Sequence, residues 1–438
     1  MPRRRTLGVD VAAALNLVGV LLKYVSLTAL FPTAIAIGYS ESPWPFLAAG
    51  AVTAAFGFGL ERLTRGKDRV GVREGFLVVS LTWLLAAAFG ALPYLFSGED
   101  QLARPLDAYF ESMSGFTTTG SSILTDVEAL PNSLLMWRQF TQWLGGMGII
   151  VLFLAVLPRM RVGGRQLFQT ELPGPEIEPL AATIRDTARR LWLLYIGLTA
   201  ALATLLTAFA WTGIDERMSP FEAVAHAFST LPTGGFSTEA RSIEAFGAAT
   251  QWAIAFFIVV AGANFALLYV AVVRGRLGTF RRDEEFRLYT ALLLLGSAVL
   301  LADVLTEELL AGEAALRHAF FQAASIMTGT GFASTDFNEW PILATIVLLA
   351  LMFFGGSAGS TTGSMKVVRH LMIGRILRRE LDQTVHPEVV APVRLNGTPV
   401  DERTLRAVLA FVLLYVGIFA LGALGLVVDA ARAGVEVR

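Results

Sequence analysis

Long apolar segments are the feature that most restricts how this chain can fold. A helix needs about 20 apolar residues to cross roughly 30 Å of hydrocarbon, and nine stretches approach or exceed that length. They lie at residues 11–37, 44–59, 75–95, 134–157, 191–211, 252–273, 288–305, 342–354 with its continuation, and 405–428. Of the 438 residues, 54% are hydrophobic and only 16% are charged, which excludes an ordinary soluble domain. The sequence therefore predicts an all-α integral membrane protein with about nine transmembrane helices.

The distribution of charge predicts the orientation of these helices. Basic residues collect at the N-terminus, in Arg3, Arg4 and Arg5, and in residues 62–73, 159–190, 274–287 and 366–406. The connections between these segments are rich in Asp and Glu. Because cytoplasmic loops carry an excess of Lys and Arg, we expect the N-terminus to be cytoplasmic and the acidic connections to be external. Those acids either raise the local concentration of cations at the external face of the protein or simply form a solvated rim there.

The sequence gives no support for enzyme chemistry. Cysteine is absent, so neither disulfides nor thiolate metal sites can form. No His, Asp and Glu cluster has metal-ligand spacing, and no nucleophile is paired with a base. We therefore expect neither an enzyme nor a cofactor-binding protein, and no nucleic-acid partner.

An internal repeat organises the chain. Three connections contain an apolar stretch too short to span, followed by hydroxyl residues and glycine, at residues 109–124, 224–240 and 320–337. When Glu111, His226 and Gln322 are set in register, the glycines Gly120, Gly235 and Gly331 also align without a gap. Each repeat then reads as a spanning helix, a half-length helix with Gly and Thr at its end, and a second spanning helix.

A half-helix that stops inside a membrane is typical of a re-entrant pore loop. Irregular backbone is tolerated at that depth only where it is buried in protein or lines a wet cavity. Glycine adopts positive φ angles without steric cost, and rings of backbone carbonyls can replace the water shell of an ion. The alternative is that these glycines only permit tight turns. The predicted filter residues are Thr117, Thr118, Thr119, Gly120, Thr233, Gly234, Gly235, Thr328, Gly329, Thr330 and Gly331.

A further glycine-rich stretch interrupts the second spanning helix of the third repeat. It resembles a phosphate-binding loop but lacks the required Gly-Lys-Ser/Thr ending, so we do not expect nucleotide binding. It predicts either a mobile gating loop below the pore, with a lysine that disfavours cations or pairs with an acid, or a packing face between helices. The predicted gating residues are Gly355, Gly356, Gly359, Ser360, Thr361, Thr362, Gly363 and Lys366.

Several of these motifs together resemble the bacterial TrkH/KtrB family of potassium-uptake membrane subunits. They are FESMSGFTTTGSS, HAFSTLPTGGFST, SIMTGTGFASTDF, QWLGGMGIIVLFLAVLPRM and GGSAGSTTGSMKVVR, and the similarity covers nearly the whole chain. Two extra helices before the first repeat make the chain more similar to TrkH than to KtrB. The resemblance implies four helix, loop, helix units around a pseudo-fourfold pore that admits potassium across the bacterial inner (plasma) membrane. It also implies a filter glycine in each unit, and Gly120 suggests selectivity for potassium.

Partners are likewise implied by the resemblance. Family members are homodimers that dock a cytosolic nucleotide-binding regulatory ring of the TrkA or KtrA kind. The basic segments 274–287 and 375–379 are candidate docking surfaces, or their charges only set the orientation. Potassium is then the transported substrate, bound by backbone carbonyls, and no other cofactor is implied.

The repeats divide the chain unequally. We expect two extra N-terminal helices in residues 1–73, pore-loop repeats in 74–160, 180–275 and 284–375, and the first helix of an incomplete fourth repeat in 376–438. A fourth pore loop would fall near or after residue 430, and the sequence shows neither it nor a last helix. Either the sequence is truncated, another chain completes the pore, or the subunit does not conduct alone. A competing class is a secondary cation symporter, which would instead show inverted repeats and intramembrane carboxylates.

Three other polar residues lie in or near apolar runs. Lys23 is within the first predicted helix, where a structural contact is favoured over a functional one. His226 lies in the second half-helix and His318 just before the third. We expect both histidines to pack or to form hydrogen bonds.

Overall fold

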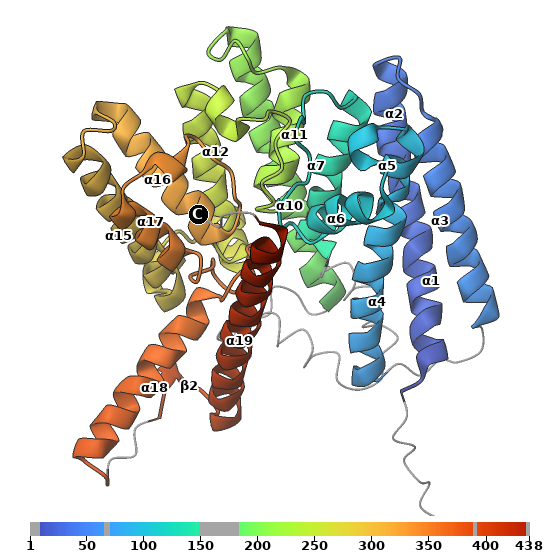
Figure 1. The fold of residues 1–438 in the computed structure, drawn as a ribbon. Helices are drawn as coiled ribbons and strands as arrows, with labels where there is room; N and C mark the ends of the chain where they lie inside the picture. The colour runs from blue at the N-terminus through green and yellow to red at the C-terminus, as the bar shows by residue number, and fades with distance from the viewer. Residues whose placement is uncertain (1–8, 65–70, 149–183, 389–391, 435–438) are drawn as a thin grey trace, which may run out of the picture.

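Helices make up most of the described part of this protein (Figure 1). The computed structural model describes residues 9–64, 71–148, 184–388 and 392–434. Within these ranges the only sheet is a small antiparallel hairpin of β1 (Arg394–Leu395) and β2 (Thr398–Pro399). The prediction of an all-α chain with several apolar helices is confirmed.

Three helices form the N-terminal part of the chain: α1 (Val11–Thr28), α2 (Leu30–Gly38) and α3 (Trp44–Leu63). Of these, α1 and α3 pack closely at two glycines. A Cβ at either Gly19 or Gly57 would lie 2.9 Å from the carbonyl oxygen of the other, so the absence of a side chain lets α1 and α3 approach. Lys23 Nζ lies 2.6 Å from Glu61 Oε2 across this pair. The expected structural contact of Lys23 is therefore confirmed.

The first repeat follows at residue 72. It contains α4 (Val72–Gly90), α5 (Leu92–Ser97), the 3-10 helix η1 (Asp100–Leu102), the half-helix α6 (Pro105–Phe116) and α7 (Asn132–Gly146). Proline occupies the first turn of α6, where its missing N–H costs nothing. The predicted span 134–157 continues beyond α7 into residues outside the described ranges.

The second repeat contains a sharply bent helix pair. Its elements are α10 (Ile184–Thr212), α11 (Pro220–Thr230), η3 (Ser242–Ala245), α12 (Ala248–Ala261), α13 (Phe265–Leu268), the π-helical η4 (Tyr269–Val273) and α14 (Thr279–Arg282). The predicted span 252–273 is not one straight helix, because the chain turns by 104° between α12 and α13. The Asn264 side chain accepts hydrogen bonds from the amides of Ala266 and Leu267 and so begins a new helix there.

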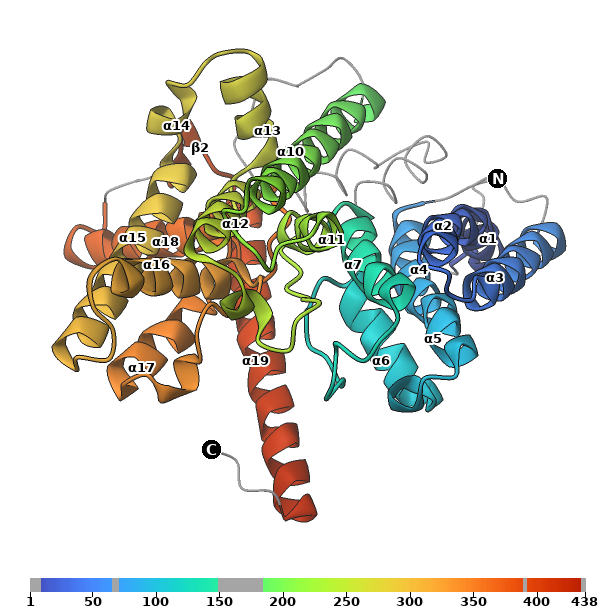
Figure 2. The same ribbon diagram turned by 90° about the horizontal axis from the view of Figure 1, so that it is seen from above.

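The third repeat and the C-terminal helix complete the described chain. They comprise α15 (Glu284–Thr306), α16 (Gly312–Thr328), η5 (Phe337–Glu339), α17 (Ile342–Leu351), α18 (Val367–Val385) and α19 (Glu402–Ala433). In Figure 2, α19 projects away from the body. Only Leu405 and Val408 of α19 are buried, so almost all of its apolar surface is exposed.

Six helices of the described residues are long and apolar enough to cross a membrane, or up to seven if the bent α12–α13 pair forms one span. Of the other predicted spans, 252–273 is bent, 342–354 is interrupted, and 134–157 runs into residues outside the described ranges. Ten-residue α17 ends at Leu351 and is followed by irregular chain. The largest cluster of buried side chains comes mainly from the second and third repeats and includes Tyr195 and Tyr289. A second cluster packs the first half-helix α6 against α7, with Phe116 and Trp137.

Candidate functional site

The three half-helices end in the same backbone bend. In each, the residue two before the aligned glycine has a left-handed φ, and so does the glycine. The φ values are 53° and 78° at Thr118 and Gly120, 54° and 82° at Thr233 and Gly235, and 74° and 82° at Gly329 and Gly331. Such φ values are uncommon outside glycine, so their recurrence at aligned positions supports the predicted register.

An equivalent hydrogen bond closes each bend. The amide of the residue before the glycine donates to a serine carbonyl five positions earlier. The N···O distances are 2.9 Å for Thr119 to Ser114, 2.8 Å for Gly234 to Ser229 and 2.8 Å for Thr330 to Ser325. These bonds satisfy carbonyl groups at the C-terminal ends of the half-helices, which the helices themselves leave unpaired.

Threonine hydroxyls reinforce the first and third bends. Thr117 Oγ1 lies 2.8 Å from Thr119 Oγ1, and the aligned Thr328 Oγ1 lies 2.8 Å from Thr330 Oγ1. The second bend has Pro232 and Gly234 at the aligned positions and so cannot form this contact. Its support comes from a neighbouring helix instead.

The bends lie next to one another in chain order. A Cβ at Gly120 would lie 2.2 Å from the carbonyl oxygen of Gly234, and one at Gly235 would lie 1.8 Å from that of Thr330. Gly234 and Thr330 hold aligned positions, so the first bend meets the second as the second meets the third. The same contact is repeated from one bend to the next, as expected for repeated units arranged around a common axis. A Cβ at Gly331 would meet no described atom within 4 Å.

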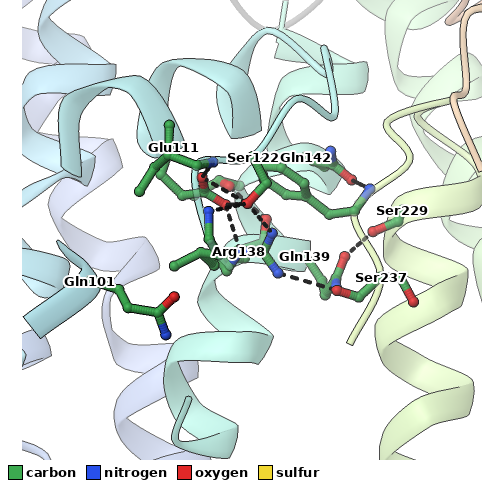
Figure 3. Close-up of polar contacts among 12 residues, drawn as sticks. Gln101, Glu111, Ser122, Arg138, Gln139, Gln142, Ser229 and Ser237 are labelled. Atoms are coloured by element: carbon green, nitrogen blue, oxygen red, sulfur yellow. Dashed lines mark hydrogen bonds and ion pairs between the residues drawn. The ribbon is translucent and has the colours of Figure 1, made fainter. Parts of the chain in front are cut away.

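A buried ion pair joins the first two bends (Figure 3). Arg138 of α7 and Glu111 of α6 are 1% and 0% exposed, and Arg138 Nε donates to Glu111 Oε1 at 2.7 Å. The Arg138 guanidinium also donates to the Ser237 carbonyl at 3.2 Å and to Ser122 Oγ at 3.4 Å. Ser122 in turn donates to Glu111 at 3.0 Å. Arg138 was not singled out from the sequence, although an arginine within a predicted span often marks a functional site.

Two glutamines of α7 hold the second bend. Gln142 Nε2 donates to the Gly234 carbonyl at 2.8 Å, and Gln142 Oε1 accepts from the Phe236 amide at 3.1 Å. Gln139 Oε1 accepts from the Ser229 hydroxyl. Both side chains are buried. These two glutamines were not singled out from the sequence either, because no local pattern predicts which neighbouring segment a helix will contact.

The aligned polar residues of the other half-helices form weaker contacts of the same kind. His226 Nε2 lies 3.0 Å from Ser237 Oγ, in the same register as Glu111 and Ser122. In the third repeat Ser334 Oγ lies 2.9 Å from His318 Nδ1 and 3.5 Å from Gln322 Nε2. The hydrogen-bonding roles expected for the histidines are confirmed. The position expected for His318 is wrong, because α16 begins at Gly312 and already includes it.

The predicted gating residues form a folded loop between α17 and α18. The amide of Gly355 donates to the Met365 carbonyl at 2.8 Å, which closes the loop on itself. The Ser357 amide donates to the Gly262 carbonyl at 2.8 Å, and the Phe265 amide donates to the Gly359 carbonyl at 3.1 Å. The loop therefore packs on the bend between α12 and α13, and that bend exposes the backbone groups it needs.

The same loop reaches the filter region. Thr361 Oγ1 donates to the carbonyl of Leu231, the C-terminal cap of α11, at 2.9 Å. A Cβ at Gly329 would lie 3.9 Å from the Gly363 amide nitrogen. The loop thus contacts the second half-helix and approaches the third bend.

Two charged residues hold the loop in place. Lys366 Nζ donates to Thr362 Oγ1 at 3.0 Å and also to the Thr362 carbonyl. Glu285 Oε1 accepts from the amides of Ala358 at 2.6 Å and Val368 at 3.1 Å, and its side chain is buried. Glu285 was not singled out by sequence, because it opens a helix next to Glu284 and reads as an ordinary N-terminal acid.

Acidic side chains gather in the connection after the second bend. The Ala240 amide donates to Glu128 Oε1 at 3.1 Å, and Glu222 accepts from the Thr238 hydroxyl. Partial burial, followed by the charges of Glu128 and Glu222, raises the pKa of Glu239. In the ranges that the structure describes, no group of three or more His, Cys, Asp and Glu side chains could hold a metal ion.

Comparison with known proteins assigns the family. Residues 45–431 match TrkH, a family described as cation transport protein. The chain belongs to this family. It is 36% identical over 428 residues to the Trk system potassium uptake protein TrkH of Salmonella typhimurium, covering 95% of this chain and 85% of that protein. It is 37% identical to the Halomonas elongata protein of the same name, covering 94% and 84%.

A solved structure has the same fold. The crystal structure of the potassium transporter TrkH from Vibrio parahaemolyticus superposes with a TM-score of 0.84 at 34% identity, covering 96% of this chain and 86% of that chain. The chain is therefore a multi-pass membrane cation transporter and not an enzyme.

Proposed function

We propose that this chain admits potassium across the bacterial inner membrane through a passage lined by the three bends, with its N-terminus in the cytoplasm. The observation that carries the proposal is the contact of aligned positions, Gly120 with Gly234 and Gly235 with Thr330. Units related in this way share an axis, and a shared axis is what an ion path needs. The names of the relatives, potassium uptake proteins, support the choice of ion.

In this proposal the backbone of residues 117–120, 233–235 and 328–331 forms the filter. Carbonyl oxygens coordinate a desolvated potassium ion without competing for it as a carboxylate would. The C-terminal ends of the half-helices carry partial negative charge, which favours a cation beside them. Of the side chains on the bends, none is acidic in these three ranges, which argues against the midplane carboxylates of a symporter.

A fourth wall is part of the proposal. A Cβ at Gly331 would meet no described atom within 4 Å, whereas a Cβ at Gly120 or Gly235 would meet the next bend. We infer that the working pore has a further segment beside Gly331 in addition to the described residues, and another chain is one source of it. A subunit that needs another chain for this wall would not conduct alone.

The loop 355–366 serves as the gate in this scheme. It is tied to the α11 cap through Thr361 and to α15 through Glu285, so it lies between the bends and the α12–α13 break. Opening then requires these hydrogen bonds to separate. Replacing residues 356–364 by a short flexible linker should raise uptake at saturating rubidium, and unchanged uptake would reject the gate.

The proposed transporter works with partner subunits. A homodimer with a cytosolic nucleotide-binding regulatory ring fits the family resemblance, and α18 offers a basic surface for docking. Arg378 on α18 is exposed, while Arg375 and Arg379 pair with Glu284 and Glu402. Arg378 is therefore the arginine of this segment that is best placed to meet a partner.

The test is rubidium influx into cells that lack their own potassium uptake. Gly120→Ser should abolish influx, because its Cβ would overlap the Gly234 carbonyl. Gly98→Ser is the matched control: Gly98 has φ 80°, close to the 78° of Gly120, but no neighbour within 4 Å. Influx that survives Gly120→Ser as well as Gly98→Ser would refute the filter, and no influx from the unaltered chain would favour the subunit that needs a partner.

A further inference from the structure

We propose that Arg138 is a positioning residue for ion selectivity, which fixes the first bend against the second and so sets the width of the filter. The inference rests on the proposed function. Arg138 itself does not contact the ion. It acts by tying together two walls whose separation decides how well a desolvated ion is held.

The contacts of Arg138 fall on both bends (Figure 3). On the first, its guanidinium bonds Glu111 in the half-helix and Ser122, two residues after Gly120. On the second, it bonds the Ser237 carbonyl, and its Cζ lies 4.2 Å from the centre of the Phe236 ring. Phe236 directly follows Gly235. The Arg138 side chain therefore contacts residues that follow the filter glycine within two positions in both bends.

The chemistry of the group suits this task. A guanidinium is planar and presents its donors in a fixed fork, so contacts made by separate nitrogens hold their acceptors at set positions. Arg138 uses Nε for Glu111, one terminal nitrogen for Ser237 and the other for Ser122. A lysine in its place offers a point charge on a flexible stem and cannot fix three acceptors in one plane.

The pair adds rigidity without adding net charge near the ion path. Burying an ion pair is expensive, and an apolar pair of similar volume often gives equal stability. Stability alone therefore gives little reason for Arg138 and Glu111 to be 1% and 0% exposed. Geometry gives a reason, since directional bonds specify the position of both bends.

Among the described residues, no buried ion pair ties the second bend to the third. Instead the backbone of Ala333, two residues after Gly331, donates to Ser242 Oγ at 3.2 Å and accepts from the Glu244 amide at 3.0 Å.

Between the second and third bends, the aligned half-helix residue His226 contacts only groups of its own repeat, Glu222 and Ser237, by hydrogen bond. The third repeat has Gln322 at this position, whose contact to Ser334 is 3.5 Å long. The first junction is thus the one that a buried, charged side chain holds rigid. A smaller ion such as sodium is held well only if the carbonyls can close around it, so stiffness here favours potassium.

The experiment measures rubidium and sodium influx separately in the full-length chain, with membrane abundance determined for each variant. Arg138→Lys should lower the rubidium-to-sodium influx ratio by about tenfold, because the charge is kept while the fork is lost. Glu111→Gln should lower rubidium influx by about tenfold, because an unpaired positive charge remains behind the filter. Adding Arg138→Gln to Glu111→Gln should recover influx but not the ratio.

Two further variants keep the test decisive. Ser122→Ala removes only the hydroxyl shared by Arg138 and Glu111, so it should fold and lower the ratio by about threefold. Arg317→Lys alters the Arg317–Glu313 pair of the third half-helix and should leave the ratio unchanged. An unchanged ratio in Ser122→Ala and in whichever Arg138 variants accumulate would overturn the proposal. No rubidium influx in the unaltered chain would instead overturn the proposed function, and this inference with it.

Discussion

The first two bends and the third bend have the same backbone but different support. All three share the left-handed residues and the closing hydrogen bond to a serine carbonyl. The first two are also braced by Arg138 and Gln142 of α7. The third is held by its own Ser325, whose hydroxyl donates to the Phe332 carbonyl at 2.7 Å, and by backbone bonds of Ala333 to the preceding connection rather than by a buried charged or amide side chain of a neighbouring helix. The comparison teaches that the bend is a local property, whereas its placement depends on neighbouring helices.

The largest effect on rubidium influx is expected from substitutions at the filter glycines, which compare the second bend with the third. Gly235→Ser should abolish rubidium influx, because its Cβ would lie 1.8 Å from the Thr330 carbonyl oxygen. Gly331→Ser meets no described atom, so the strain of a left-handed φ, about 1–2 kcal/mol, would by itself leave part of the influx. With the proposed further segment beside Gly331, this substitution should abolish influx as well. Rubidium influx, corrected for membrane abundance, measures both.

The outcome for Gly331→Ser also tests the fourth wall. If Gly331→Ser is as damaging as Gly235→Ser, a further segment fills the space beside Gly331 in the working pore. If it is harmless, that side stays open and the third bend differs in function as well as in support.

A smaller effect is expected from the braces. Gln142→Leu leaves the buried Gly234 carbonyl and Phe236 amide without their partner, at about 1–3 kcal/mol for each, and should lower rubidium influx by about tenfold. Gln322→Leu removes only a 3.5 Å contact, and its Oε1 has no partner among the described residues. Its influx should stay within about twofold of the unaltered chain. Equal losses in the two variants would show that the third bend depends equally on its brace.

The smallest effect concerns pH at the connection after the second bend. Because the pKa of Glu239 is raised, the folded protein binds this proton more tightly than the unfolded chain, so the contribution of Glu239 to stability increases as pH falls. Protonation also removes negative charge that attracts cations. Lowering external pH towards 5 should therefore reduce influx, by about twofold, at subsaturating rubidium.

Glu239→Gln should flatten this pH response. Glu339→Gln, in the connection after the third bend, removes the same charge and should leave the response in place. A response that persists unchanged in Glu239→Gln would assign it to another group.

The sequence predicted the membrane class, the register of the three bends and the position of the interrupted segment after α17. These depend on composition and short-range spacing, so they can be found without a fold. The bend within the predicted span 252–273 was not foreseen, because hydropathy averaged over a window does not register a helix start at a single residue such as Asn264. The place of His318 was wrong for a similar reason, since α16 extends through polar residues that hydropathy leaves out.

What the sequence determined by itself is therefore the repeated bend, because a left-handed residue, a glycine and a serine carbonyl five positions from the closing amide all lie within one short stretch. Only the tertiary structure decided which bends touch, that Arg138 spans the first two, and that Glu285 holds the loop 355–366. Those contacts join residues far apart in the chain. Their formation depends on how helices pack, and no local pattern records that packing.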